Sequence, residues 1–301
     1  MALPSFYRFK GNFCQGKKEG FVASALVFEM NSMSQIFGIL NMTTDSFSDG
    51  GLFLDPKSAK EQGQKLRNDG ADYLDISGQS SNVKSALVSE ELEWERIEPT
   101  LRHFISLGIP TSVDSFRPNV QAKALEAGTQ VLNDITGFTH PDARSLFKDP
   151  FLSQSQAKLI VMHSHTLGIA KEKSELTPEN VVPTILNFFR DRKSELTSWG
   201  IAEERIYFDP GMGFFLGEDP ELSFTVLRNI DRILSEFPRL MLGVSRKSFL
   251  GNVLGGLPPK EREMPTFATE IYLLQKKVPM IRTHDVLKLT QAKKILSLLG
   301  K

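Results

Sequence analysis

Short apolar runs, each closed by a polar residue, recur along most of this chain. Eight such runs occur, and nearly all of them stop at Asn, Asp, His, Arg or Lys. The runs, each with its polar end, are Ile36–Leu40 before Asn41, Tyr73–Leu74 before Asp75, Thr111–Val113 before Asp114, Val131–Leu132 before Asn133, Leu159–Met162 before His163, Ile206–Phe208 before Asp209, Leu240–Val244 before Ser245, and Val278–Ile281 before Arg282. Runs of this length predict buried strands.

Helix signals fill the intervals between these runs. A cap residue or an early proline precedes most of them, as at Asp55-Pro56, Ser89 and Asp219-Pro220. The expected helices are 56–69, 90–107, 118–128, 177–199, one from 220 onward, 267–274 after Met264-Pro265, and 287–299. Alternating strands and helices predict parallel strands joined by right-handed crossovers. Eight such units predict an α/β fold of the (β/α)8 TIM barrel type, which builds its active site from the carboxyl ends of its strands.

This pattern divides the chain unevenly. Residues 36–301 are expected to form one barrel domain, a length that α/β barrels often reach as a single unit. Residues 1–35 do not fit the pattern, and we expect either a hairpin that closes the barrel bottom or an unpacked N-terminal extension. A translation start at Met30 or Met33 is a further expectation for this segment.

Composition narrows the class of protein. Lysine and arginine balance aspartate and glutamate, 36 against 36, so net charge gives no reason to expect a nucleic acid or membrane partner. Cys14 is the only cysteine and excludes an intrachain disulfide, which fits a reducing compartment. The apolar stretch Phe21–Phe28 is too short to span a bilayer and is poorly flanked for a secretory signal. We therefore expect a cytoplasmic protein.

A long polar segment, Asn41–Gly51, follows the first run and ends in two glycines. One interpretation is a solvated loop whose Asn, Asp, Ser and Thr side chains satisfy its own backbone. The other is an oxygen-rich site for a hard cation such as Mg2+, holding a phosphate-bearing substrate. The segment alone does not decide between them.

Three strand ends carry groups that suit a planar heterocycle. Asp114, Asn133 and Asp209 follow three different runs. A ring with several N–H groups and ring nitrogens needs fixed acceptors and an amide that both donates and accepts. Each of these residues alone is also typical of a helix cap. Three of them at one barrel mouth favour a binding site.

Positive charge follows the last two runs. Arg246 and Lys247 come after the seventh run, and Arg282 and His284 after the eighth. This quadrant of a barrel commonly binds phosphate. Arg282 can hold phosphate bidentately, and Lys247 can act as a point charge. For Arg246 alone we favour a structural ion pair.

The segment Asp209–Phe214 places two glycines beside the sixth strand end, where they let backbone approach a flat ligand closely. Phe214 is suited to stack on such a ligand and equally to pack in the core. Other motifs are incomplete, since the sequence has no P-loop, dinucleotide fingerprint or nucleophile elbow. His163 and His165 lack the further ligands of a zinc site, and we interpret His163 as an orienting or hydrogen-bonded histidine.

Taken together, these residues resemble the dihydropteroate synthases of folate biosynthesis, from about Ile36 to the C-terminus. Four segments are similar to that family's signatures, namely GILNMTTDSFSDGG at 38–51, DPGMGF at 209–214, SRKSF at 245–249 and RTHDV at 282–286. The family condenses a pterin-methyl diphosphate with p-aminobenzoate and releases diphosphate. Four matches in the right order, each after a predicted strand, make the resemblance specific.

The resemblance implies a role for each matching residue. The residues that match the pterin-binding positions are Asp114, Asn133, Asp209 and Lys247. Those for the diphosphate are Arg282 and His284, together with Asn41, which would bind it through Mg2+. Those for p-aminobenzoate are Ser81 and Ser248. Asp114, Asp209 and Lys247 are the expected catalytic residues, and the two carboxylates can stabilise a methylene that becomes cationic as diphosphate leaves. Because diphosphate is a good leaving group, no protein nucleophile is needed. The family also implies a homodimer.

One segment departs from the family pattern. The family usually reads Asp-Ile-Gly-Gly-Glu-Ser-Thr-Arg-Pro-Gly after the second strand, whereas residues 75–84 here read DISGQSSNVK. Ser81 keeps a hydroxyl at the Thr position, but Asn82 and Val83 replace the Arg-Pro pair, and Lys84 is the nearest replacement cation. The pterin side therefore matches the family, and the p-aminobenzoate side differs.

Two further functions stay open beside the synthase, which we favour. The altered segment is compatible with a divergent or non-catalytic pterin-binding paralogue. A pterin-dependent methyltransferase of the same barrel superfamily is the other alternative. Lys247, Arg282 and His284 argue against it, because methyl transfer needs no diphosphate site.

Overall fold

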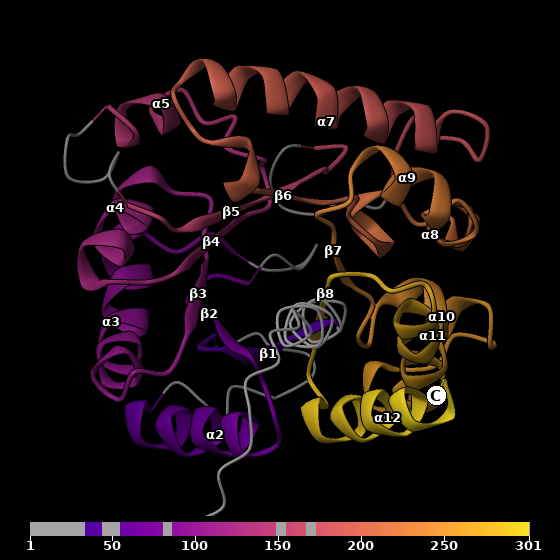
Figure 1. Ribbon diagram of the computed structural model, residues 1–301, viewed down its shortest axis with the longest axis horizontal. Coiled ribbons are helices and arrows are strands. Elements are labelled where there is room, and N and C mark those ends of the chain that lie inside the picture. Colours follow the sequence, from indigo (N-terminus) through magenta and orange to yellow (C-terminus); the bar gives the residue numbers. More distant parts are fainter. Residues whose placement is uncertain (1–33, 44–54, 81–85, 149–154, 167–172, 301) are drawn as a thin grey trace, which may run out of the picture. The chain divides into compact units, whose positions relative to one another are not determined.

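Eight parallel strands run through the centre of the fold, and helices lie outside them (Figure 1). The computed structural model describes residues 34–43, 55–80, 86–148, 155–166 and 173–300. The strands are β1 (Gln35–Asn41), β2 (Tyr73–Ser77), β3 (Thr111–Asp114), β4 (Val131–Asp134), β5 (Lys158–Met162), β6 (Ile206–Asp209), β7 (Met241–Gly243) and β8 (Met280–Thr283). They are hydrogen-bonded in the order β6-β5-β4-β3-β2-β1-β8-β7, and one bridge from Phe208 to Leu240 returns the sheet to β6. The predicted (β/α)8 barrel is confirmed.

Helices connect the successive strands. They are α2 (Pro56–Asn68), α3 (Glu90–Ser106), α4 (Pro118–Ala127), α5 (Ala143–Leu146), α7 (Val181–Ser198), α8 (Pro220–Arg228), α9 (Ile230–Glu236), α10 (Ser248–Asn252), α11 (Glu263–Gln275) and α12 (Val286–Leu299), with short 3-10 helices η1 (Glu203–Arg205), η2 (Gly213–Phe215) and η3 (Pro259–Glu261). The predicted caps Asp55, Ser89 and Asp219 each accept a main-chain N–H in the first turn of their helix. Every helix in the described part of the chain is either too short or too polar to span a bilayer.

Most strands include the polar residue that closes their apolar run, and β2 and β8 hold a charged residue in their interior. β2 continues to Ser77, so Asp75 lies within the strand and not after it. Arg282 likewise lies within β8. A charged residue can stand inside a barrel strand when it faces an opposite charge, and these two side chains are paired. The predicted N-terminal extension lies outside the described residues except for its last two, and β1 begins at Gln35.

Two helices begin at residues other than those predicted. α7 starts at Val181, because Asn180 Oδ1 accepts the Thr177 N–H at 2.7 Å and holds the preceding residues in turns. α11 starts at Glu263 and contains Met264-Pro265 in its first turn. Proline is tolerated there because the first turn's N–H groups have no partner within the helix.

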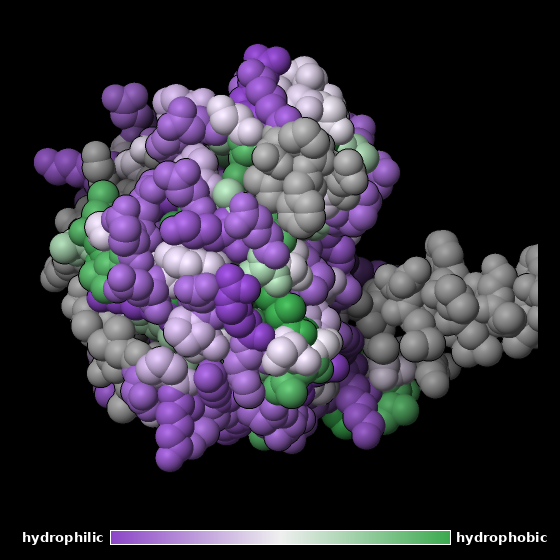
Figure 2. All heavy atoms as spheres, turned by 90° about the vertical axis from the view of Figure 1, so that its left-hand side faces the viewer, coloured by the Kyte–Doolittle hydropathy of each residue, from purple (hydrophilic) through white to green (hydrophobic). Residues whose placement is uncertain are grey.

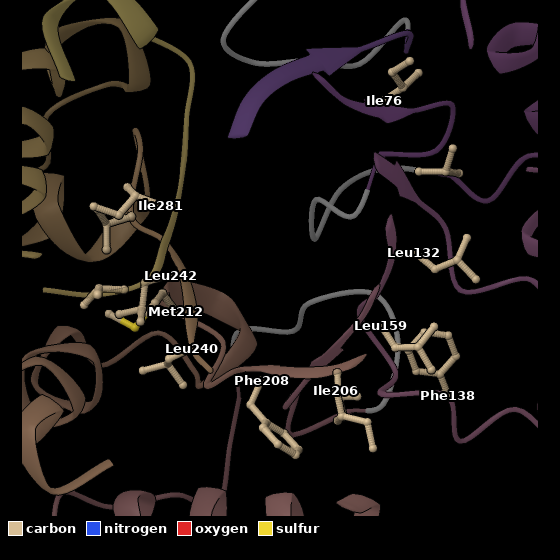
Figure 3. Packing of buried hydrophobic residues seen from close by; sticks show 14 of the residues in the cluster. Ile76, Leu132, Phe138, Leu159, Ile206, Phe208, Met212, Leu240, Leu242 and Ile281 are labelled. Carbon is tan, nitrogen blue, oxygen red and sulfur yellow. The ribbon is translucent and has the colours of Figure 1, made fainter. Parts of the chain in front are cut away.

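The outer faces of the strands pack against the helices. Side chains such as Ile76, Leu132 and Phe208 point away from the lumen into this layer (Figure 3). The helices in turn bury one face, as α3 does with Ile97 and Phe104. Their other faces meet solvent, and the side of the molecule that carries α3 and α4 is mostly hydrophilic (Figure 2). This amphipathic pattern produced the helix signals in the sequence.

A separate apolar layer fills the amino end of the barrel lumen. It consists of Phe37, Val131, Ile160, Met241 and Met280, with the half-buried Tyr73 and Tyr207 packed against them. Side chains two positions further along a strand lie on the same face. The next inward residues on β2, β4, β6 and β8 are Asp75, Asn133, Asp209 and Arg282. The side chains that face the lumen therefore change from apolar to polar or charged within two residues along these strands.

Candidate active site

Three charged side chains meet in the lumen toward the carboxyl ends of β2, β3 and β8. Arg282 donates from Nε to Asp75 Oδ2 and from Nη2 to Asp114 Oδ2, the second bond measuring 2.7 Å. The Asp75 side chain is fully buried, and that of Asp114 is 13% exposed. Burial raises the pKa of Asp114 to about 7, while Arg282 opposes this rise and Asp75 adds to it. The guanidinium is thus the shared counterion of two carboxylates.

Asn133 stands next to Asp114 in the strand register. Its side chain is buried, and its Oδ1 has no hydrogen-bond partner within the described protein. A second acceptor of the lumen, Asp75 Oδ1, is buried and unpaired in the same way. Buried polar atoms in native proteins nearly always have a partner. These two atoms therefore indicate a ligand that carries N–H groups.

A second pair of opposite charges is supplied by β6 and the start of α10. Asp209 Oδ1 accepts the Gly211 N–H at 2.8 Å. Lys247 donates to the Met212 carbonyl at 3.3 Å, and its Nζ lies 4.5 Å from the centre of the Phe215 ring. Burial raises the pKa of Asp209 to about 6 against the effect of Lys247. Burial lowers the pKa of Lys247 to about 8 against the effect of Asp209, so both groups are mainly charged near neutral pH.

The glycines after Asp209 serve close packing within the protein. Gly211 has a φ of +69°, and a Cβ there would collide with the His163 carbonyl oxygen. This contact alone requires glycine. The His163 N–H also donates to the Asp209 carbonyl at 2.8 Å, and burial lowers the pKa of the His163 ring to about 4. His163 is therefore a neutral residue that holds the β6 end in place.

Phe214 lies in the short helix η2 at the rim of the lumen. It is half-buried and packs, together with Phe116, against a small cluster of Ile135, Met162 and Phe215. One part of the ring therefore contributes to packing, and the other part stays accessible. The structure shows the packing role of Phe214, and its stacking on a flat ligand stays a prediction.

His284 and Ser245 join the ends of β8 and β7. Ser245 Oγ accepts the His284 main-chain N–H at 3.3 Å and lies 2.9 Å from His284 Nδ1. The 2.9 Å distance fits a hydrogen bond in either direction, because a hydroxyl can donate one hydrogen and accept two. Burial, followed by the charges of Arg246, Arg282 and Lys247, holds the pKa of His284 well below its usual value. His284 is thus a neutral imidazole among cations.

Comparison with known proteins agrees with this arrangement. Residues 37–284 match the family described as pterin binding enzyme. The chain is 44% identical over 269 residues to dihydropteroate synthase type-3 of Escherichia coli, which covers 89% of this chain and 100% of the relative. The chain belongs to the dihydropteroate synthase family.

Solved structures of dihydropteroate synthases share the fold. The enzyme of Xanthomonas albilineans with 4-aminobenzoic acid has a TM-score of 0.78 and 28% identity, over 90% of this chain and 94% of that one. The Anaplasma phagocytophilum enzyme with bound 6-hydroxymethylpterin-monophosphate has a TM-score of 0.77 and 27% identity, over 89% of this chain and 99% of that one. The whole barrel, and not one motif, is therefore similar to this family.

The remaining predicted residues occupy the same end of the barrel where the structure describes them. Asn41 is the last residue of β1 and lies level with Ser77 of β2. Ser248 begins α10, and its Oγ would lie 3.4 Å from a Cβ built on Gly213. Ser81 and the four residues that follow it lie outside the described residues.

Asp75 is a site residue that the sequence pattern did not reveal. The pattern marks it only as the end of the second run and gives it no ligand or charge partner. Its contact with Arg282 joins residues 207 positions apart and forms only when β1 brings β8 close to β2. The available signal was period-two alternation from Tyr73, which directs Asp75 into the lumen.

Proposed function

We propose that this protein is a dihydropteroate synthase that joins (7,8-dihydropterin-6-yl)methyl diphosphate to p-aminobenzoate and releases diphosphate. The observation that carries the proposal is the unpaired Asn133 Oδ1 beside Asp114, in a lumen whose far side holds Lys247 and Arg282. Acceptors for ring N–H groups and cations for a diphosphate thus lie at one barrel end. The family membership and the ligands of the related structures support the same reaction.

In this proposal the pterin ring lies against β3, β4 and β6. Asp114 and Asp209 accept ring N–H groups, and the Asn133 amide pairs with a donor–acceptor edge. Lys247 donates to a ring acceptor. As the bond between methylene carbon and diphosphate oxygen breaks, the electron pair leaves with the oxygen and the carbon becomes electron-poor. The fixed carboxylates of Asp114 and Asp209 stabilise that developing positive charge.

Arg282 and His284 receive the diphosphate. Arg282 uses Nε and Nη2 for Asp75 and Asp114, and a guanidinium has five N–H groups in all, so it can hold both carboxylates and still donate to phosphate oxygens. In this proposal the neutral His284 ring carries its hydrogen on Nε2 and donates it to a phosphate oxygen. The result is a quadrant that stabilises negative charge on the leaving group.

Mg2+ is the cofactor that this chemistry requires, and the residues present fit it as a metal held mainly by the substrate. Asn41 would supply one hard oxygen donor at the end of β1. Mg2+ usually keeps waters and phosphate oxygens and takes few protein ligands. Within the described ranges, no group of three His, Cys, Asp or Glu residues is placed to form a protein-only cage. When bound, Mg2+ would neutralise charge on the diphosphate oxygens.

The arylamine completes the reaction from the side of Ser248, Phe214 and Ser81. Its amino nitrogen forms a bond to the methylene carbon as the diphosphate oxygen departs, and it then loses a proton to water. Phe214 provides an accessible ring face at the rim, and Ser248 provides a hydroxyl beside Lys247. Proximity and fixed charge supply the rate, since no protein nucleophile takes part.

We further propose that the enzyme is a cytoplasmic homodimer that pairs through its last helices. The face of α12 that carries Leu287, Ile295 and Leu298 is apolar and exposed, and these positions recur at helical spacing. Nearby Met264 on α11 is also exposed. Sedimentation equilibrium tests the dimer, and an Ile295→Glu/Leu298→Glu double variant should dissociate it.

The experiment that tests the reaction measures diphosphate release by the purified protein with the pterin-methyl diphosphate and Mg2+, with and without p-aminobenzoate. We expect release that depends on the arylamine and matches dihydropteroate formed, mole for mole. Asp114→Asn is the matched control, because it preserves side-chain shape and removes the charge. Calorimetric binding of the pterin without turnover would favour the paralogue instead. Methyl transfer to a corrinoid acceptor would favour the methyltransferase.

A further inference from the structure

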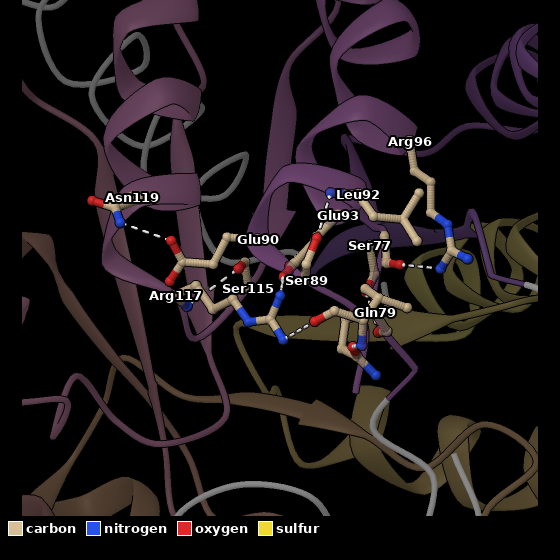
Figure 4. A network of polar contacts seen from close by, with 12 residues as sticks. Ser77, Gln79, Ser89, Glu90, Leu92, Glu93, Arg96, Ser115, Arg117 and Asn119 are labelled. Atoms are coloured by element: carbon tan, nitrogen blue, oxygen red, sulfur yellow. Dashed lines mark hydrogen bonds and ion pairs between the residues drawn. The ribbon is translucent and has the colours of Figure 1, made fainter. Parts of the chain in front are cut away.

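The side chain of one glutamine is hydrogen-bonded to residues at both ends of the connection between β2 and α3 (Figure 4). Gln79 is only 7% exposed. Its Oε1 accepts the Val88 N–H at 2.8 Å, and its Nε2 donates to the carbonyls of Ala86 at 3.2 Å and Ser80 at 2.6 Å. A single amide therefore joins the first residues of the connection to its last ones.

Val88 is held from a second direction as well. Arg117, which follows β3, donates from Nη2 to the Val88 carbonyl. The Nη1 atom of the same guanidinium lies 3.3 Å from Glu93 Oε2 of α3, and the Glu93 side chain is fully buried. Both main-chain polar groups of Val88 are thus used. The end of the connection is therefore fixed relative to both β2 and β3.

The start of the connection is equally constrained. Ser77 Oγ donates to the Gln79 carbonyl at 2.7 Å. Arg96 of α3 donates to the Gly78 carbonyl at 2.9 Å. A Cβ on Gly78 would lie 2.7 Å from the Glu93 carbonyl oxygen, so α3 packs directly on the end of β2. Gln79 reaches across from this fixed start to the fixed end.

The chemistry of an amide is essential to this arrangement. An amide accepts one N–H and donates to carbonyls, and Gln79 does both. A glutamate, the residue of the family pattern, could accept the Val88 N–H, but its second oxygen would then face the carbonyls of Ser80 and Ala86. Ser77 and Gln79 both depart from the family pattern, and they are hydrogen-bonded to each other.

We propose that Gln79 is a positioning residue for the arylamine side of the reaction. By joining Ser80 to Ala86 and Val88, it fixes Ser80 relative to the end of β3. Ser80 directly precedes Ser81 in the sequence, the residue expected to bind p-aminobenzoate. The inference rests on the proposed function. It predicts an effect on one substrate and not on the other, because the Gln79 amide bonds to the main chain of its own connection and not to the pterin-side residues that end β3, β4 and β6.

Steady-state kinetics of Gln79→Glu and Gln79→Met test this, with each substrate varied separately. We expect both variants to raise the KM for p-aminobenzoate about tenfold at pH 8, the effect of losing buried hydrogen bonds. The KM for the pterin diphosphate should stay within twofold. On acidification the carboxyl introduced by Gln79→Glu gains a proton and can donate again, so the KM of that variant relative to the parent at the same pH should recover. The Met variant should not recover, and the charged groups around position 79, Arg117, Glu93 and Arg96, are common to all three proteins.

Gln130→Glu is the matched control. Gln130 makes the same kind of bridge at the amino end of β3, since its Oε1 accepts the Thr111 N–H at 2.8 Å and its Nε2 donates to the Gly128 carbonyl at 2.9 Å. That change should alter thermal stability without moving either KM. Equal rises in both KM values, or none, in an active Gln79→Glu would overturn the inference and leave the proposed function intact. Absence of turnover in the parent would overturn the proposed function, and the inference with it.

Discussion

Polar groups at the two ends of the barrel lumen differ in whether they have hydrogen-bond partners within the protein. At the amino end, the Lys158 ammonium lies 5.2 Å and 5.4 Å from the ring centres of Tyr73 and Tyr207, and it donates to the Tyr73 hydroxyl at 3.1 Å. At the carboxyl end, Asp75 Oδ1 and Asn133 Oδ1 are buried without a partner in the described part of the chain. The same strands, two residues apart, carry both arrangements.

This difference distinguishes polar groups that stabilise the fold from polar groups that are unpaired until a ligand binds. A polar group whose partners are all within the protein contributes to stability in every state of the enzyme. An unpaired buried acceptor costs stability until a ligand donates to it. Barrel enzymes place their chemistry at the carboxyl end for reasons of topology. In this protein the unpaired oxygens of Asp75 and Asn133 lie at that same end.

Arg282→Met should have the largest effect, a loss of protein stability that originates at the carboxyl end of the lumen. It leaves Asp75 and Asp114 in the lumen without their shared counterion, and breaking a buried ion pair costs about 3–5 kcal/mol. Denaturant unfolding at pH 8 should show this loss. The loss should shrink at pH 5, because burial raises the pKa of Asp114 to about 7 and its carboxyl group is then protonated. Arg282→Lys keeps the charge and should restore part of the stability. A parent-like unfolding curve for Arg282→Met at pH 8 would rule out the shared-counterion role.

Asp114→Asn should have the next largest effect, on pterin affinity. A buried ring N–H loses a charged acceptor worth roughly 1.5–3 kcal/mol, which corresponds to about 10- to 100-fold weaker binding. Isothermal titration with the pterin-methyl diphosphate measures it. Asp142→Asn is the control, since that side chain is 77% exposed and its ionic contact is with His140 and not with a lumen residue. Equal affinities of Asp114→Asn and the parent would refute the assignment of Asp114 to the ring.

The pH dependence of stability sharpens the assignment of Asp114. Its pKa is raised to about 7 in the folded protein from an ordinary 3.8. Between these values the folded state holds the proton and the unfolded state has released it. The stabilisation from Asp114 is thus fully present below about pH 4 and is lost as pH rises through 7. Asp114→Asn should therefore gain about 4 kcal/mol on the parent from pH 4 to 8. A constant difference would mean that Arg282 keeps Asp114 ionised throughout.

The fold and most of the site were predictable because both follow from local periodicity. Asp114, Asn133 and Asp209 end short apolar runs, and parallel strands in a barrel bring such ends together. The caps at Asp55, Ser89 and Asp219 are likewise local signals, and the structure confirms them. The family motifs then selected one chemistry from those that the residues allowed.

What the sequence did not reveal depends on register and on distant contacts. Asp75 lies inside β2 because Arg282, far along the chain, supplies its counterion. The Gln79 bridge to Val88 likewise needs the exact path of a connection that sequence patterns treat as a loop. Gly211 was predicted to admit a ligand, and the structure adds a contact with the His163 carbonyl that requires glycine by itself. Periodicity specifies which face a residue takes, but it does not specify its partner.

Lys158→Met should have the smallest effect and provides the reverse test at the amino end. The substitution keeps an unbranched apolar stem and removes two hydrogen bonds, to Tyr73 and Gln35, and two cation–π contacts, so we expect a loss of about 1–2 kcal/mol in unfolding free energy. The kcat and both KM values should stay within twofold of the parent. Asp114→Asn should show the opposite profile, with a large loss of affinity and, at pH 8, no loss of stability. If Lys158→Met instead reduced kcat/KM tenfold, the two ends of the lumen would be coupled, and the unpaired acceptors alone would no longer define the functional end.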